Sequence, residues 1–307
     1  MAKLPNGLIS FGKNANCTLE LCPLEASILQ YQPSIPGNGA IIGLFALSML
    51  IHIIQGVRWR SWDFMICMVI GCVDEIIGYV GRIMLHSNPF SFAAFVIQVV
   101  CITTAPVFFC SAIYVMLSRT INYLDRSLSH FNPKFFVWFF IPIDIVSLIL
   151  QAAGGALSAT QSGSGNKLGV RISMAGLILQ VVTLVIFVAL FIDYVVRYVR
   201  KSTARPLQSR MKLFLSFLFL SIVFVLVRCI YRIDELRDGY DGPLIRNEPL
   251  FMVLEAAMMV IAVFCLNVGH PGIVFDREPR NDAEMSYTYT GNTGAMLQPK
   301  LPSSSSE

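Results

Sequence analysis

Residues 211–231 read MKLFLSFLFLSIVFVLVRCIY, an apolar run long enough to cross a lipid bilayer. An α-helix rises about 1.5 Å per residue, so roughly 20 residues span a hydrocarbon core of about 30 Å. Six further runs of this kind occupy residues 39–57, 63–85, 92–117, 135–157, 170–196 and 250–268. None of them alternates apolar with polar residues as a membrane β-barrel strand does, and lipid offers the backbone no hydrogen bonds. The sequence therefore predicts an all-α integral membrane protein, a bundle of seven transmembrane helices.

The rest of the chain consists of two tails and short connections. Hydrophobic residues make up 55% of the sequence and charged residues only 14%, so we expect a single domain. We place an N-terminal tail at residues 1–36, the membrane domain at 37–275 and a second tail at 276–307. The second tail ends in Pro-Ser-Ser-Ser-Ser-Glu and is too poor in apolar residues to order itself, which predicts disorder.

Lysine and arginine residues in the connections predict the orientation in the membrane. They are concentrated after the first, third and fifth runs, and the stretch from Arg197 to Lys212 alone carries six of them. Because positively charged loops stay in the cytosol, we expect the N-terminus outside and the C-terminus in the cytosol. The net charge of +4 is then mainly an orientation signal, and with no other basic face we expect no nucleic-acid partner.

The N-terminal tail carries two features of an extracytoplasmic segment. It lacks the pattern of a removable signal peptide, so we expect the first helix to serve as the insertion signal. Asn16-Cys17-Thr18 is an acceptor sequence for N-glycosylation. Cys17 and Cys22 are close enough to form a disulfide in an oxidising compartment. We expect a glycosylated, disulfide-bearing tail, with an unmodified asparagine and two free thiols as the alternative.

Polar residues inside the seven runs carry the functional information. Glu75, Tyr79 and Arg82 are spaced i, i+4 and i+7, which places them on one helix face. Another run stacks its polar residues in the same way, and the other runs contribute one or two each. These further candidates are Arg228, Arg232, Glu235, Gln98, Asp144, Gln151, Gln180 and Glu255. With the expected orientation, all of them form one polar layer in the outer half of the bundle.

This polar layer needs a physical explanation, because a charged residue at the centre of a membrane helix costs about 2.5–3.5 kcal/mol. The charges must pair, become protonated or meet water. One reading is a structural lattice of salt bridges, such as Glu75 with Arg228. The other is a hydrated cavity, open to the outside, that receives a ligand, and the size of the cluster favours it. Its balanced or slightly acidic charge would accept a cationic or zwitterionic head group.

Several chemistries are excluded by missing residue patterns. The sequence has no G-x-x-x-x-G-K-[ST] phosphate loop and no G-x-S-x-G nucleophile motif. Its four histidines are scattered, which argues against a metal site. We therefore expect neither an enzyme nor a bound cofactor or metal.

Blocks of residues in the membrane domain resemble a known family. They include Tyr31-Gln32-Pro33-Ser34, Glu75-x-x-Gly78-Tyr79-x-Gly81-Arg82, Asp144-x-x-Ser147-x-x-x-Gln151, Gly176-x-x-x-Gln180, Arg228-x-x-Tyr231-Arg232-x-x-Glu235 and His270-Pro271-Gly272. In this order and spacing they are similar to the signature blocks of the fungal RTA-like proteins, also called lipid-translocating exporters. The similarity covers roughly residues 29–275.

The resemblance implies a seven-helix fungal membrane protein, resident in the plasma membrane or in the vacuolar or another internal membrane. Its members are linked to export of sphingoid long-chain bases, to resistance against toxic amphiphiles such as aminocholesterol-type compounds, and to porphyrin and haem movement. We accordingly expect a translocator of a lipid or another amphiphile, with the polar layer holding the head group. Two alternatives stay open: a heptahelical receptor that couples its ligand to a cytosolic partner, and a passive scaffold within a membrane complex.

Overall fold

The computed structural model describes residues 8–10, 12, 16–124, 126–129, 131–160, 164–201, 208–237, 239, 242 and 244–275. The chain divides into two units, Met1–Val274 and Phe275–Glu307. The fold described below is that of the first unit. The tail at residues 276–307, for which the sequence predicts disorder, lies outside the described residues.

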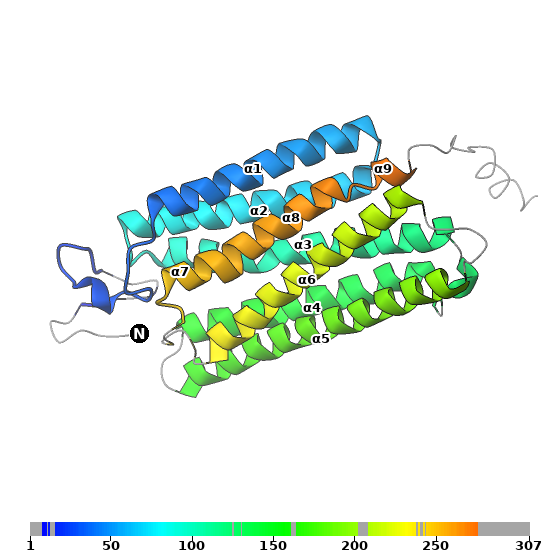
Figure 1. Cartoon of the computed structure of the whole chain (residues 1–307). Coiled ribbons are helices and arrows are strands. Elements are labelled where there is room, and N and C mark those ends of the chain that lie inside the picture. Colours follow the sequence, from blue (N-terminus) through cyan, green and yellow to red (C-terminus); the bar gives the residue numbers. More distant parts are fainter. Residues whose placement is uncertain are drawn as a thin grey trace, which may run out of the picture. The chain divides into compact units, whose positions relative to one another are not determined.

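Seven helical spans build this unit (Figure 1). Six are continuous helices, namely α1 (Ile35–Arg58), α2 (Trp62–Ser87), α3 (Phe92–Leu124), α4 (Pro133–Thr160), α5 (Ser164–Lys201) and α6 (Ser209–Arg237). The seventh consists of α7 (Glu248–Phe251), the π-helical segment η4 (Met252–Ala257), α8 (Met258–Val268) and the final turn α9 (Gly272–Phe275). All seven are long and apolar enough to cross a membrane, which confirms the predicted fold class. The orientation of the termini stays a prediction.

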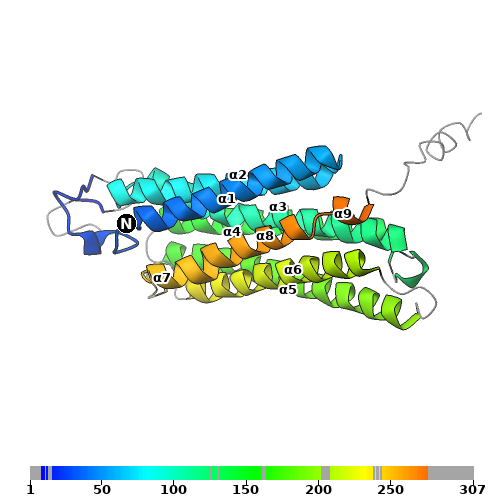
Figure 2. The same ribbon diagram turned by 45° about the horizontal axis from the view of Figure 1, so that its top comes forward.

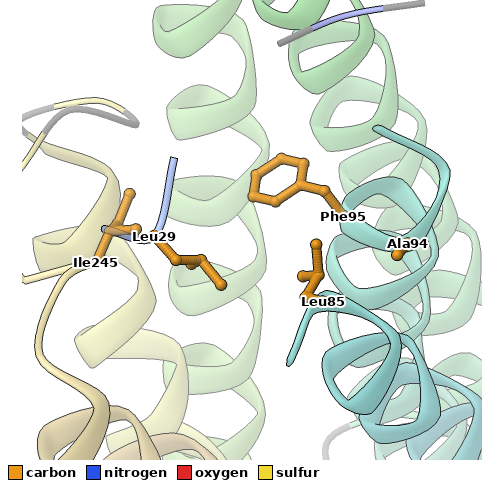
Figure 3. Packing of buried hydrophobic residues seen from close by; sticks show 5 residues of the cluster. All are labelled: Leu29, Leu85, Ala94, Phe95 and Ile245. Carbon is orange, nitrogen blue, oxygen red and sulfur yellow. The ribbon is translucent and has the colours of Figure 1, made fainter. Parts of the chain in front are cut away.

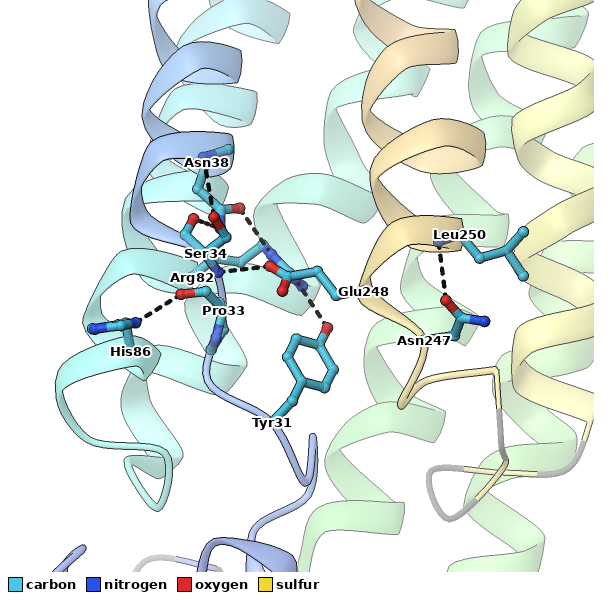
Figure 4. Close-up of polar contacts among 10 residues, drawn as sticks. Tyr31, Pro33, Ser34, Asn38, Arg82, His86, Asn247, Glu248 and Leu250 are labelled. Carbon is cyan, nitrogen blue, oxygen red and sulfur yellow. Dashed lines mark hydrogen bonds and ion pairs between the residues drawn. The ribbon is translucent and has the colours of Figure 1, made fainter.

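The helices extend beyond the apolar runs from which they were predicted. The run at 170–196, for example, belongs to a helix that continues from Ser164 to Lys201. Apolar composition marks only the part that lipid can cover, whereas helix ends are set by capping groups. Ser34 supplies such a cap for α1, because its Oγ accepts a hydrogen bond from the Gly37 amide at 3.3 Å. Asn247 does the same for α7, at 3.2 Å from the Leu250 amide (Figure 4).

Figures 1 and 2 show the seven spans running side by side, and their contacts close into a ring. Each long helix packs on its successor, and α8 packs on both α6 and α1, so the first and last spans are neighbours. Helix α3 also contacts α6 across the middle. Half of the residues in the most apolar windows of α3 and the seventh span are buried, against 22% for α1. The centre of the bundle therefore lies mainly against α3 and the seventh span, whereas α1 faces outward over most of its surface.

Helices α4 and α5 approach each other very closely through small residues. A Cβ atom added to Gly154 would lie 2.4 Å from the Ser173 amide nitrogen, and one added to Gly176 would lie 2.6 Å from the Ser147 carbonyl oxygen. Only glycine fits at these positions, as expected where membrane helices associate through backbone contact.

The N-terminal segment lies over one end of the bundle. Leu29 packs with Leu85 at the end of α2, Phe95 at the start of α3, and Ile245 before the seventh span (Figure 3). Nearby, the structure joins Cys17 and Cys22 in a disulfide, with their Cα atoms 5.6 Å apart. The described residues just before α1 thus pack against this end of the bundle.

Candidate functional site

A buried ion pair between Arg228 of α6 and Glu255 of η4 lies at the centre of the bundle. The guanidinium donates to one carboxylate oxygen of Glu255 through Nε at 2.8 Å and Nη2 at 2.5 Å. Neither side chain has any exposed area. Removing two charges from water carries a large desolvation penalty, which their close contact offsets.

The third contact of Arg228 is a backbone carbonyl of α3 that a proline leaves without its helical donor. Pro106 has no amide hydrogen, so the Ile102 carbonyl, four residues earlier, loses its ordinary helical hydrogen bond. Arg228 Nη2 donates to this carbonyl at 2.8 Å. The guanidinium therefore replaces the hydrogen bond that Pro106 cannot make, and it connects α3, α6 and the seventh span.

Glu255 reaches this position from a π-helical segment. Residues Met252–Ala257 form wider turns than the α-helices on either side, and this segment packs against α1 and α6. Such π-helical insertions occur frequently at functional sites. The apolar run at 250–268 predicts a helix here, but nothing in its residues indicates the wider π-helical turns.

Glu75 and Tyr79 of α2 lie close to this ion pair without joining it. Both are buried, and neither carboxylate oxygen of Glu75 nor the Tyr79 hydroxyl makes a hydrogen bond to any described residue. The Tyr79 ring stacks on Phe45, with centroids 6.1 Å apart. The salt bridge suggested between Glu75 and Arg228 is therefore wrong, because Arg228 pairs with Glu255 instead.

Arg82, one turn beyond Tyr79, is held by four groups, and Figure 4 shows three of them, Tyr31, Asn38 and Glu248. Its guanidinium donates to Asn38 Oδ1 and to the Tyr31 hydroxyl, each at 3.0 Å, and lies 3.7 Å from a Glu248 oxygen and 4.0 Å above the Phe251 ring. Glu248 also accepts a hydrogen bond from the Ser34 amide at 2.7 Å. This cluster fastens the segment before α1 to α2 and α7.

Burial raises the pKa of Tyr31 above its usual value, although the positive charge of Arg82 partly opposes the shift. The tyrosine hydroxyl therefore stays protonated at neutral pH and can serve as a neutral hydrogen-bonding partner of the guanidinium.

A small chamber with both polar and apolar lining residues adjoins the Arg82 cluster, and we call it the polar chamber. It has a volume of about 30 Å³, and its polar lining consists of Tyr31, Arg82, Gln98, Arg232 and Glu235. Arg232 and Glu235, one turn apart on α6, form an ion pair. The oxygen Oε1 of Gln98 is buried and accepts no hydrogen bond from the residues that the structure describes.

The remaining predicted residues form two separate contacts. The Tyr114 hydroxyl of α3 donates to Asp144 of α4 at 2.9 Å. The Gln151 amide of α4 donates to Gln180 of α5 at 3.1 Å. The single polar layer expected from the sequence is therefore a set of distinct clusters around the bundle.

Sequence reasoning missed several polar residues. Asn38 and Glu248 lie near the ends of apolar runs, and their partnership with Arg82 depends on how α1 and α7 are placed. At the other end of the bundle, His270 contacts Ser61 at 3.4 Å, and both His270 and His52 are fully buried. In the described ranges, no group of three or more His, Cys, Asp or Glu residues could hold a metal.

Comparison with known proteins identifies relatives of most of the chain. The family model described as RTA1 like protein matches residues 68–278. The sphingoid long-chain base transporter RSB1 of Saccharomyces cerevisiae (strain Lalvin EC1118 / Prise de mousse) is 30% identical over 279 residues, covering 79% of this chain and 73% of the relative. Protein RTM1 of Saccharomyces cerevisiae is 34% identical over 68% of each chain. Protoporphyrin uptake protein 1 of Saccharomyces cerevisiae is 34% identical over 67% of this chain and 68% of the relative. No solved structure matches the chain.

Proposed function

Because the chain belongs to the RTA1-like protein family, we propose that it is a membrane transporter of a lipid or another amphiphile. Two of the relatives carry names that denote transport or uptake of an organic molecule, a sphingoid long-chain base in one case and protoporphyrin in the other. Each relative is matched over two thirds or more of its length, and the matches cover 79% and 67% of this chain. A non-enzymatic role agrees with these names.

The observation that carries the proposal is the incomplete satisfaction of the buried charges. Glu75 has no hydrogen-bond partner among the described residues, and the same holds for Arg228 Nη1 and Glu255 Oε2. A purely structural lattice would satisfy these atoms, because an unpaired polar group in a low-dielectric interior is expensive. Water or the polar head of a ligand would satisfy them. We place the head group of the cargo beside Glu75, Tyr79 and the Arg228–Glu255 pair during its passage.

We retain the predicted orientation and location as part of the proposal. The N-terminus would lie outside, with the disulfide of Cys17 and Cys22 in an oxidising compartment and Asn16 glycosylated. Asn16 is exposed, as a glycan acceptor must be. The plasma membrane is the proposed location, with the vacuole or another internal membrane as the alternative. Loss of an endoglycosidase-sensitive mass shift in an Asn16→Gln variant tests the orientation directly.

Transbilayer movement of a fluorescent long-chain base in liposomes tests the proposed site. Wild-type protein is compared with Glu75→Gln, which keeps the size of the side chain and removes its charge. Glu25→Gln is the matched control, because Glu25 is exposed in the segment before α1. We expect Glu75→Gln to abolish movement while Glu25→Gln behaves as wild type.

The same experiment separates the proposal from its rivals. If Glu75→Gln moves the probe at the wild-type rate, the head group does not use this site. If the wild type binds the probe without moving it, a receptor becomes the better reading. The amount of folded protein, followed by size-exclusion elution, must be equal for all variants in order to exclude misfolding.

A further inference from the structure

A second, mainly apolar cavity lies beside the polar chamber and has no role so far. Its volume is about 370 Å³, within the range of about 300–1,000 Å³ typical of small-molecule sites. The start of α3 and the end of α4 form most of its wall, and α5 and α6 contribute the rest. It therefore lies in the same half of the bundle as the Arg82 cluster.

Most of its wall is apolar, although the buried Thr103 Oγ1 and Gln151 Oε1 make no hydrogen bond among the described residues. The other two hydroxyl groups in the wall are occupied. Thr104 donates to the Val100 carbonyl of its own helix at 2.8 Å, and Ser173 donates to the Gln151 carbonyl at 3.0 Å. Thr104 and Ser173 thus present chiefly carbon atoms to the cavity, alongside the apolar side chains of Phe95, Val99 and their neighbours. Such a surface suits a hydrocarbon chain.

The cavity reaches the outer surface of the bundle between α3 and α4. Val100 of α3 lines the cavity and is nevertheless 46% exposed. Ala152 and Ala156 of α4 also line it and are exposed. Helices α3 and α4 are neighbours, and within a membrane their exposed faces meet lipid. A molecule dissolved in the bilayer could enter by this route without crossing water.

The apolar cavity and the polar chamber share one wall. Phe95, Val99, Arg232 and Leu236 line both of them. On the polar side, Gln98 Oε1 is a buried acceptor without a donor among the described residues, and the Arg232–Glu235 ion pair lines the same chamber. An unsatisfied acceptor of this kind calls for a head group that donates a hydrogen bond, such as an amine or a hydroxyl.

We propose that this pair of chambers is a binding site for a single-chain amphiphile, which enters from the lipid between α3 and α4. At this entry stage its alkyl chain lies in the apolar cavity, and its amine- or hydroxyl-bearing head points past Arg232 toward Gln98 and Glu235, before the passage beside Glu75 proposed above. The inference rests on the proposed transport function, and it specifies the kind of cargo and its route of entry.

Two adjacent alanines of α4 allow a matched test. Ala152 and Ala153 are both exposed, but only Ala152 lines the cavity. In the Ala152→Trp variant the indole should block the mouth of the cavity, whereas in Ala153→Trp it should point into lipid. The probe is an octadecylamine that carries a diazirine on its last carbons and a fluorescent tag for flux in liposomes. We expect Ala152→Trp to slow its movement by about tenfold or more, equivalent to roughly 1.4 kcal/mol, and Ala153→Trp to leave it unchanged.

Photo-crosslinking identifies the residues that contact the probe, whether or not the probe crosses the bilayer. With wild-type protein, the diazirine should attach within residues 92–104 and 148–156, and Ala152→Trp should remove this labelling while Ala153→Trp retains it. Labelling confined to other helices, or equal labelling of the two variants, would overturn the site. Labelling at the expected residues without any flux in the wild type would support the site and count against transport, so the two proposals fail separately.

Discussion

Replacing Arg228 with methionine removes a cation that holds three parts of the bundle together. Methionine replaces the aliphatic part of the arginine side chain but has neither the guanidinium group nor its charge. The variant leaves the Glu255 carboxylate buried without its cation and the Ile102 carbonyl without a donor. We expect a lower free energy of unfolding, chiefly through these two groups.

The magnitude follows from the observed contacts. Breaking a fully buried ion pair by removing one partner costs about 3–5 kcal/mol. The loss of the donor to the Ile102 carbonyl adds about 1–3 kcal/mol, because Pro106 cannot supply a replacement amide. We therefore expect Arg228→Met to lower the free energy of unfolding by at least about 3 kcal/mol. Arg210→Met is the control, because Arg210 is exposed at the start of the same helix.

A double-mutant cycle separates the two contributions. Pro106→Ala restores an amide hydrogen four residues beyond Ile102, and so can satisfy its carbonyl when Arg228 is absent. In the Arg228→Met background, Pro106→Ala should recover about 1 kcal/mol relative to its effect in the wild type. Denaturant unfolding in detergent micelles, followed by far-UV circular dichroism, gives the four free energies. Equal effects of Pro106→Ala in both backgrounds would refute the backbone role of Arg228. A loss below about 1 kcal/mol in Arg228→Met would refute the importance of the ion pair.

Three further predictions concern packing, the Arg82 cluster and pH. Gly154→Val should lower the midpoint of thermal unfolding by several degrees, because its Cβ would overlap the Ser173 amide, while Gly43→Val, with nothing within 4 Å of its Cβ, should not. Arg82→Lys should cost about 1.5–3 kcal/mol in unfolding experiments, since a lysine cannot reach all four partners; an unchanged stability would contradict the cluster geometry. Because the pKa of Tyr31 is raised by burial, the folded state favours its protonated form, so its contribution is intact below about pH 10 and lost as pH rises further. A Tyr31→Phe variant should show a smaller loss of stability above pH 10, and an identical pH profile would argue against this assignment.

The number of spans was predictable from the sequence because lipid imposes a simple requirement. Each span needs roughly 20 apolar residues, and no other arrangement of this chain meets that need. The pairing of charges was not predictable in the same way. Glu75 and Glu255 are both carboxylates inside helices, and which one meets Arg228 depends on the rotation of each helix and on the π-helical turns of Met252–Ala257.

Residues outside the apolar runs were harder to anticipate. Glu248 is the first residue of α7, and from the sequence it is an ordinary acidic residue at a helix start. In the structure it contacts both Arg82 and the Ser34 amide. Its importance depends on how the segment before α1 crosses the end of the bundle. The apolar cavity could not be predicted from the sequence either. Small and large apolar residues look alike in a hydropathy pattern, and only the way they pack determines whether a space is left between them.

Movement and binding of a long-chain base, measured in the same liposomes, test the central claim most directly. Purified wild-type protein is reconstituted, a fluorescent long-chain base is added, and an impermeant quencher reports how much of the probe has crossed the bilayer. We predict that the wild type accelerates crossing over protein-free liposomes and that the Glu75→Gln, Glu255→Gln double variant does not. Saturable binding by the wild type with crossing no faster than in protein-free liposomes would contradict the account.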